Sequence, residues 1–313
     1  MSRERATSES ANAGMEASRA AALRAGTVAA FVTYAMWGLF PLYWKRLAAI
    51  DPFVILCHRI VWAALFSLIL LAVQGRLATL FTLFKDRKRA ITALASAILI
   101  TINWGTYIWA VNAGHVTESS LGYYINPLLS VLLGALIFRE KLDGWTSAAV
   151  LIAAGGIGAA SVMLGGLPWI SLVLASSFAL YGAVKKKAAL DPITGLAAET
   201  VIATPFAIAY LALQHRHGVA IFGAGDHLAT ALLVLAGVVT AVPLITFAFA
   251  ANRIPLQRMG FIQYVSPTGQ LALGLFVYAE RMTEPLRVAF ATVIAAVVLY
   301  AATRNRLRAV QAR

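Results

Sequence analysis

Apolar residues follow one another in long runs that short polar stretches separate. Ten such runs of about 20 residues can be drawn, and at about 1.5 Å per residue each is long enough to cross a hydrocarbon core of roughly 30 Å. The pattern therefore predicts an all-α integral membrane protein with ten transmembrane helices. The predicted segments are 26–44, 52–73, 90–111, 119–138, 145–164, 169–184, 193–213, 228–251, 260–278 and 286–302.

The fourth predicted helix carries a stripe of polar and small residues, and the stripe recurs 140 residues later in the ninth. Its members fall at spacings i, i+3, i+4, i+7 and i+11, so they share one helix face. They are Tyr123, Asn126, Pro127, Ser130 and Gly134 in the first copy, and Gln263, Ser266, Pro267, Gln270 and Gly274 in the second. A proline inside a membrane helix frees backbone groups that need neighbouring helices or a water-lined cavity. We expect helix breaks at Pro127 and Pro267, with a binding site between the two helices.

The same offset relates other parts of the two halves. It matches the Asp-Pro pair at Asp51 with the pair at Asp191, and Tyr124 with Tyr264. Because each half holds five predicted spans, an odd number, the second half would sit upside down relative to the first. We expect two inverted-topology five-helix repeats. The predicted boundaries are a polar tail at 1–25, the repeats at 26–164 and 165–303, and a basic tail at 304–313.

Composition indicates that lipid is the solvent for most of this chain. Of its 313 residues, 60% are hydrophobic and 12% charged, with a mean hydropathy of +0.78, more apolar surface than a water-soluble domain could bury. The formal net charge of +13 does not predict a nucleic-acid partner, because the basic residues cluster between the apolar segments. Most of them lie on one side if both tails are cytoplasmic, so we expect a multi-pass protein with cytoplasmic N- and C-termini.

Two charged residues fall inside predicted spans, Arg59 in the second and Glu199 in the seventh, at positions that the offset makes equivalent. Each lies about 12 Å from the start of its span, near the middle of the bilayer. We expect the two side chains to meet, because an unpaired charge in hydrocarbon costs several kcal/mol. Two interpretations stay open: a buried salt bridge that locks the halves together, and a substrate or proton site.

Aromatic and amide side chains gather in the same part of the chain. Asn103 and Tyr107 share one face of the third span, beside Trp104. A membrane asparagine more often joins helices than binds a ligand, but the neighbouring rings suit an amphipathic organic solute. The candidate substrate-binding residues are Trp37, Arg59, Asn103, Trp104, Tyr107, Tyr123, Asn126, Tyr181, Glu199, Gln263 and Tyr264.

Signatures of catalysis and of cofactor binding are missing from the sequence. It contains no His-Glu-x-x-His pair, no Gly-x-Ser-x-Gly elbow and no Gly-x-x-x-x-Gly-Lys loop. His215, His217 and His227 fall in one loop, which we expect to be solvated rather than metal-binding. The single cysteine, Cys57, excludes an intrachain disulfide. We expect neither an enzyme nor a cofactor nor a metal site.

The chain resembles the drug/metabolite transporter superfamily, specifically EamA-type proteins of the RarD group, over about 26–304. The motifs that carry the resemblance are His58-Arg59, Asn103-Trp104, Trp109 to Asn112, Ser120 to Tyr123, Ile125 to Leu128, Glu199, Val242 to Leu244, Gln263-Tyr264 and Pro267. The resemblance implies a carrier of the bacterial inner membrane that works by alternating access. It also implies that a small-molecule solute is held in a central cavity lined by both halves.

Several functions remain to be distinguished. The leading hypothesis is a secondary transporter, an exporter of a small amphipathic metabolite or drug-like solute. A passive channel would need a continuous polar path, and a lipid-carrier flippase would need a cavity that opens sideways to lipid. An intramembrane enzyme would need His58 or Glu199 to act as a base beside a nucleophile that the sequence does not offer. The sequence leaves open the substrate, the direction, any proton coupling and the oligomeric state.

Overall fold

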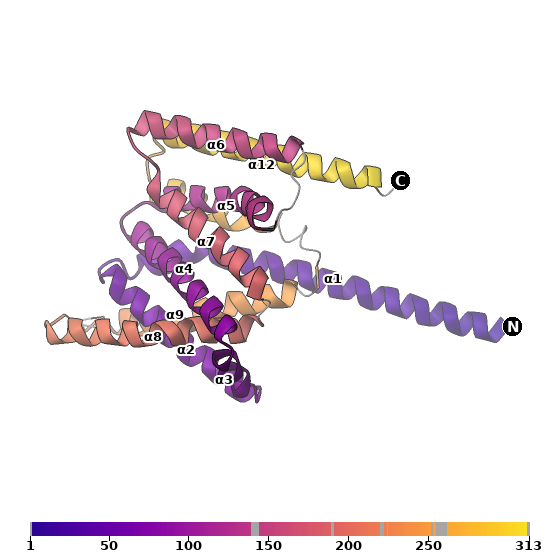
Figure 1. Ribbon diagram of the computed structural model, residues 1–313, viewed down its shortest axis with the longest axis horizontal. Coiled ribbons are helices and arrows are strands. Elements are labelled where there is room, and N and C mark those ends of the chain that lie inside the picture. The colour runs from indigo at the N-terminus through magenta and orange to yellow at the C-terminus, as the bar shows by residue number, and fades with distance from the viewer. Residues whose placement is uncertain are drawn as a thin grey trace.

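The computed structural model describes residues 2–138, 144–188, 191–219, 222–223, 225–251, 253–254 and 262–311. Every regular element in these ranges is a helix (Figure 1). In chain order they are α1 (Ser2–Lys45), α2 (Pro52–Val73), α3 (Leu77–Lys85), α4 (Arg87–Asn112), α5 (Val116–Phe138), α6 (Gly144–Leu164), α7 (Trp169–Ala188), α8 (Pro192–Arg216), α9 (His227–Ala251), α11 (Val265–Ala272), the π-helical turn η1 (Leu273–Val277) and α12 (Glu284–Gln311).

Eight helices of the described part of the chain are long and apolar enough to cross a membrane. Two further predicted segments, 169–184 and 260–278, coincide with the shorter apolar helices Trp169–Lys185 and Val265–Val277. The prediction of an all-helical, multi-pass membrane protein is confirmed, while eight of the ten predicted spans meet the criteria of length and composition. The short helix α3 was not predicted, because its nine residues cannot cross a bilayer.

Large apolar side chains cover the outside of the helices. Val73, Val162 and Phe276 are each more than 80% exposed, and many other Leu, Ile and Phe side chains are nearly as open. Such a surface would drive association in water, whereas in a bilayer the lipid chains cover it at no cost. The outer surface is therefore the lipid-facing side of the bundle.

Helices that the 140-residue offset relates pack on one another. α2 packs on α8, α5 on α11, and α6 on α12. α1 packs on α9 as α7 packs on α4. The stacked rings of Tyr124 and Tyr264, whose centroids are 5.8 Å apart, join α5 to the segment just before α11.

The matched Asp-Pro pairs begin equivalent helices. Asp51 accepts hydrogen bonds from the amides of Phe53 and Val54 at the start of α2. Asp191 accepts one from the amide of Thr194 at the start of α8. The proline that follows each aspartate occupies a position where the helix needs no amide donor. The same local signal therefore starts both helices.

One of the two predicted helix breaks, the one at Pro127, is absent from the structure. α5 continues as an α-helix through Pro127. Pro267 lies in the first turn of α11, where backbone amides have no intrahelical acceptor, so its missing N–H costs nothing. The irregular backbone of the second stripe is instead the π-helical turn η1, which contains Gly274. The same offset matches Glu140 with Glu280 and Glu118 with Arg258, and of these Glu140 and Arg258 lie outside the described residues.

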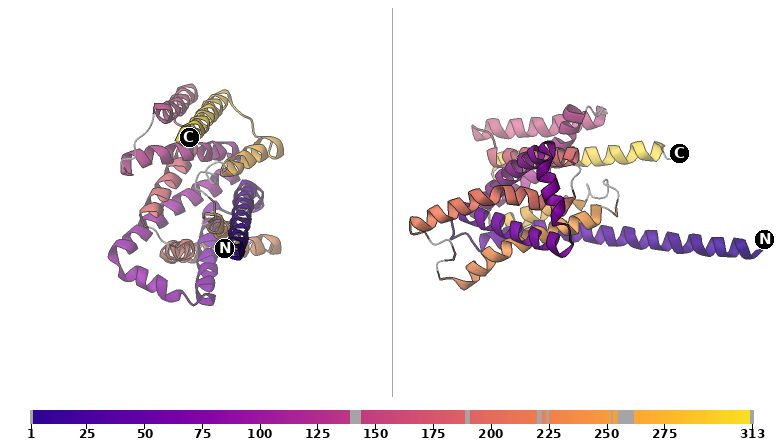
Figure 2. Two further views of the ribbon diagram at one scale, coloured as in Figure 1. Left: turned by 90° about the vertical axis from the view of Figure 1, so that its right-hand side faces the viewer. Right: turned by 60° about the horizontal axis from the view of Figure 1, so that its bottom comes forward.

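Both ends of the chain lie on one side of the bundle, where α1 and α12 project beyond the other helices (Figure 1). Along one edge α6 and α12 form a pair, which the further views show side by side (Figure 2). The remaining helices surround the centre of the molecule, where the candidate site lies.

Candidate functional site

A cavity of about 490 Å³ lies among α1, α2, α4, α5, α7, α8, α9 and α11. Its volume falls within the range of pockets that bury small organic ligands, roughly 300–1,000 Å³. Most of the residues predicted to bind substrate line it: Trp37, Arg59, Asn103, Trp104, Tyr107, Tyr123, Asn126, Tyr181 and Gln263. Pro267 also contributes to the wall. The sequence-predicted residues are thus brought to one place from both halves of the chain.

Arg59 is the buried cation of this cavity, with 4% of its surface exposed. Its Nε donates a hydrogen bond of 3.0 Å to the hydroxyl of Thr240 on α9. Its guanidinium carbon lies 4.0 Å from the ring centroid of Trp104 and 5.0 Å from that of Trp44. Two indole faces therefore hold the positive charge by cation–π attraction. Its Nη1 has no hydrogen-bond partner.

Glu199 does not pair with Arg59, so the expectation that these two side chains meet as a salt bridge is wrong. Its carboxylate accepts a hydrogen bond of 2.8 Å from the Lys185 ammonium and one of 3.1 Å from the Tyr181 hydroxyl, both on α7. Glu199 lies behind the cavity wall, and its two partners line the cavity. The offset places Arg59 and Glu199 at equivalent positions, but the rotation of α8 turns the carboxylate toward α7.

Asn103 joins three helices at the edge of the cavity. Its side-chain amide donates to the carbonyl of Leu174 at 3.1 Å and to the hydroxyl of Ser177 at 3.0 Å, both on α7. Its oxygen accepts a hydrogen bond of 3.3 Å from Tyr123 on α5. The helix-joining role that was weighed for this asparagine is therefore present, and the residue lines the cavity as well.

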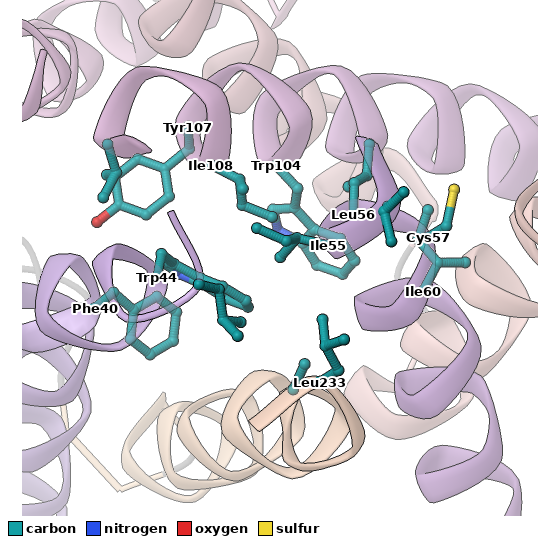
Figure 3. Close-up of a cluster of buried hydrophobic side chains, with 14 of the residues drawn as sticks. Phe40, Trp44, Ile55, Leu56, Cys57, Ile60, Trp104, Tyr107, Ile108 and Leu233 are labelled. Atoms are coloured by element: carbon teal, nitrogen blue, oxygen red, sulfur yellow. The ribbon is translucent and has the colours of Figure 1, made fainter. Parts of the chain in front are cut away.

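Aromatic side chains close the end of the cavity where α1 ends and α2 begins. Phe40 and Trp44 from α1 face Trp104 and Tyr107 from α4 (Figure 3), and all four are at most 8% exposed. We call these four residues the aromatic plug. At the other end, toward the side of the chain ends, the cavity reaches Lys185 near the end of α7 and Pro192 at the start of α8.

Hydrogen bonds between helices reinforce the plugged end. The Tyr43 hydroxyl donates to the carbonyl of Leu232, and the Lys45 ammonium donates to the carbonyl of Val111 at 3.0 Å. The Glu280 carboxylate, beyond η1, accepts three bonds of 2.7–2.9 Å, from the amides of Val116 and Thr117 and from the Thr117 hydroxyl. A carboxylate at the first turn of α5 also interacts favourably with the helix dipole. These contacts fasten the loop after η1 to the start of α5.

Two predicted site residues lie away from the cavity. Tyr264 stacks on Tyr124 in a separate apolar cluster with Phe290. Pro127 is not part of the cavity wall, although Asn126 beside it is. In the part of the chain that the structure describes, no three His, Cys, Asp or Glu side chains lie close enough together to hold a metal ion.

The sequence analysis missed several side chains of the wall. Lys185 was assigned to a basic loop, since nothing in the run of three lysines distinguishes it from its neighbours. The 140-residue offset also matches Phe247 with Tyr107, and this match is a signal that could have placed Phe247 in the wall. The other missed wall residues are Tyr34, Phe40, Ile100, Phe178, Gly182, Pro192, Leu196, Thr240 and Leu244, together with Ser266 and Gln270 of the predicted stripe.

In this structure, apolar helices of membrane-spanning length surround a central cavity. This arrangement is typical of one class of protein, the multi-pass membrane transport proteins. Comparison with known proteins is more specific. The family model of the EamA-like transporter family matches residues 24–162. The chain belongs to this family, within the drug/metabolite transporter superfamily, and it is of the RarD type.

Relatives support this membership over most of the chain. The uncharacterized transporter YojE of Bacillus subtilis is 42% identical over 88% of this chain and 93% of its own. Protein RarD of Streptomyces exfoliatus is 41% identical over 88% of both chains, and protein RarD of Escherichia coli is 36% identical over 88% of this chain and 94% of its own. One crystal structure of another protein covers 90% of this chain and 98% of its own with a TM-score of 0.57 and 17% identity. That similarity concerns the fold alone.

Proposed function

We propose that this protein is a secondary transporter that exports a small amphipathic solute across the bacterial inner membrane by alternating access. The observation that carries the proposal is the central cavity of about 490 Å³, which helices of both halves line with aromatic, amide and charged side chains. A site of this kind buries an organic molecule at the middle of the bundle, where a carrier must hold its solute. The names of the relatives, which include uncharacterized transporters, point the same way.

Ten spans arranged as two inverted five-helix repeats are the architecture that we propose for this transporter. The pairing of α2 with α8, α5 with α11 and α6 with α12 supports it, because an approximate two-fold axis brings equivalent elements together. So does the capping of α2 and α8 by equivalent aspartates. The shorter helices α7 and α11–η1 would be the remaining two spans.

Orientation follows from the charges. The basic residues around α3 and in the two tails lie on one side of the bundle, and an excess of Lys and Arg marks the cytoplasmic side of a membrane protein. We therefore propose that both chain ends are cytoplasmic. The cavity reaches Lys185 on the same side, while the aromatic plug lies at the opposite end. The conformation described here would then be the inward-facing state, and export would require the plug to open.

The alternative functions have less support. A passive channel needs a continuous polar path, whereas apolar aromatic rings fill one end of this cavity. A lipid flippase would need a lateral opening large enough for a lipid head group, and no observation favours one over a closed central site.

Cells expressing the protein provide the first test. The external medium of cells with the wild type, the Glu199→Gln variant, or no transporter is compared by unbiased mass spectrometry at matched membrane protein levels. We expect at least one metabolite to accumulate outside with the wild type and not with the other two. Three identical media would contradict export of a metabolite present in those cells.

A variant with an unaltered cavity serves as the control. Gly155 on α6 has open space around the position of an added methyl group and does not line the cavity. Gly155→Ala should therefore export the same metabolite as the wild type. If Gly155→Ala lost export to the same extent as Glu199→Gln, the loss would reflect a general effect of substitution on the protein in the membrane rather than a change in the cavity.

A further inference from the structure

Hydrogen-bond donors without acceptors gather at the plugged end of the cavity. Arg59 Nη1, the Tyr107 hydroxyl and Trp44 Nε1 are all buried and have no hydrogen-bond partner. Guanidinium and indole N–H groups can only donate, and a tyrosine hydroxyl donates readily. A buried donor that stays unpaired costs about 1–3 kcal/mol. The protein therefore supplies no hydrogen-bond acceptor for these three donors, and a bound molecule can supply one.

The charges around the cavity do not balance. Two cations, Arg59 and Lys185, line the cavity wall. Among the described residues, the only carboxylate that accepts hydrogen bonds from side chains of the wall is that of Glu199. Glu199 is 2% exposed and is already bonded to Lys185 and Tyr181. One positive charge, that of Arg59, therefore remains without an anionic partner. A cation in this position is costly in hydrocarbon, and the two indole rings compensate only in part.

The Nη1 group of Arg59 has no hydrogen-bond partner and almost no exposed surface, so a solute reaches it when the aromatic rings around it shift. The rings of Trp44 and Trp104 interact with the guanidinium, and Thr240 takes the proton of Nε. Tyr107 and Tyr123 line the same cavity as Arg59, with their ring centroids 5.8 Å apart. A guanidinium presents its remaining N–H groups as a planar fork, which matches the two oxygens of a carboxylate.

We propose that the solute carries a single carboxylate that binds Arg59 Nη1 and the Tyr107 hydroxyl, and that its apolar or aromatic body lies along Trp37, Tyr123, Phe178 and Phe247. This inference deepens the proposed transport function and rests on it. One net positive charge in the cavity selects a monoanion over a neutral molecule or a cation. The aromatic walls suit a planar body through stacking and edge contacts.

Matched acids and amides test the inference on the purified full-length protein in detergent. The probes are 2-naphthoate with 2-naphthamide, and 3-phenylpropionate with 3-phenylpropanamide, so that within each pair the shape is kept and the charge removed. Binding is followed by quenching of tryptophan fluorescence and by thermal stabilisation. We expect each acid that binds to do so roughly tenfold or more tightly than its amide, because a charge-assisted bidentate contact is lost in the amide.

Variants assign this preference to Arg59. In Arg59→Gln the acid and its amide should bind about equally, while Arg59→Lys should keep part of the preference because it keeps the charge but not the fork. If Arg59→Gln does not yield folded protein, Tyr107→Phe removes only one hydroxyl and should reduce the preference about threefold. Arg76→Gln removes a cation that is paired with Asp191 and does not line the cavity, so it should leave the preference in place.

Three results would overturn the inference: amides that bind as tightly as acids, an acid preference that survives Arg59→Gln, and failure of every acid to bind. Equal binding of acids and amides would leave the transport of a neutral solute standing. The proposed transport function fails separately, if an acid that binds with the expected preference is not moved across vesicles containing the protein.

Discussion

Glu199 is the only buried carboxylate among the residues that the structure describes, and Lys185 and Tyr181 from α7 form hydrogen bonds to it. A carboxylate in this position can exchange its lysine partner for a proton when α7 and α8 separate. That exchange would couple a change of conformation to proton movement. The coupling is a hypothesis that depends on one side chain.

Glu199→Gln tests that hypothesis in vesicles with an imposed pH gradient. Glutamine keeps the shape of the side chain but cannot take up or release a proton. We expect any transport that remains in this variant to be independent of the gradient and too slow to accumulate the solute outside cells, while transport by the wild type depends on the gradient. Tyr181→Phe, which removes one hydrogen bond but no titrating group, should retain the dependence. Unchanged dependence in Glu199→Gln would place coupling elsewhere.

Asp191 predicts a pH effect outside the spans. Burial acts to raise the pKa of this carboxyl, but the hydrogen bonds from Thr194 and the ion pair with Arg76 outweigh burial and lower it below its usual value. A carboxyl whose pKa is lower in the folded state stabilises that state above its unfolded pKa of about 3.9, and the contribution disappears as the pH falls through the folded pKa.

Asp191→Asn should therefore lower the thermal midpoint at pH 6, and the gap to the wild type should close as the pH falls below about 4. Asparagine caps a helix about as well as aspartate, so the gap reports the charge. The expected difference is small, below about 1 kcal/mol, because both partners are partly exposed. Arg76→Gln should show the same pH dependence. A gap that does not change with pH would contradict the argument.

At the scale of elements, small residues set how closely helices approach. A methyl group added at Gly156 on α6 would overlap with Thr292 on α12, and one added at Gly237 on α9 would overlap with the backbone of Trp62 on α2. Membrane helices gain little from hydrophobic burial against each other, so such close contacts carry much of their association.

Neighbouring glycines on α6 offer a matched comparison. Gly156→Ala should destabilise the fold by about 1–3 kcal/mol, because the methyl group has no room beside Thr292. Gly155→Ala, where no atom lies within 4 Å, should be neutral or slightly stabilising, since alanine favours a helix. Thermal unfolding in detergent measures both. If the two changes shifted the unfolding temperature equally, the α6–α12 contact would be looser than described.

Apolar runs predict where membrane helices lie, since eight predicted segments coincide with helices of membrane-spanning length and two overlap with shorter apolar helices. Helical spacing also placed Asn103, Tyr107, Tyr123 and Asn126 on faces that turn out to line one cavity. Periodicity does not fix how a helix is rotated against its neighbours, which is why the partner of Glu199 was predicted wrongly. The amphipathic helix α3 was missed because it is too short for a pattern based on span length.

For the whole molecule, the plugged end must open if the solute is to leave on that side. Glu280 holds this end through three hydrogen bonds to the start of α5, and each is strengthened by the charge of the carboxylate. Opening the plug would require this contact to break or to move with both segments. Weakening it should favour the conformation that is open at the plugged end.

The prediction uses a cysteine at Val116, a fully buried residue beside the contact, in a Cys57→Ala background. Val116→Cys should react slowly with a membrane-impermeant maleimide, and adding Glu280→Gln should raise the rate roughly tenfold, because the amide offers one weaker acceptor. Glu284→Gln alters an exposed carboxylate four residues on and should not change the rate. Equal rates with and without Glu280→Gln would show that this contact does not control access.

The pairing of α6 with α12 also constrains the order in which the protein can be assembled. α6 packs mainly on α12, the final helix of the chain, whose first residue follows that of α6 by 140 positions. At about 5–20 residues per second, the ribosome reaches the start of α12 roughly 7–28 s after it reaches the start of α6. Throughout that time the close-packing face around Gly156 has no native partner in the bilayer. A message truncated before α12 would therefore yield a chain that holds most of the cavity but leaves α6 unpaired, a feature that membrane quality control can recognise.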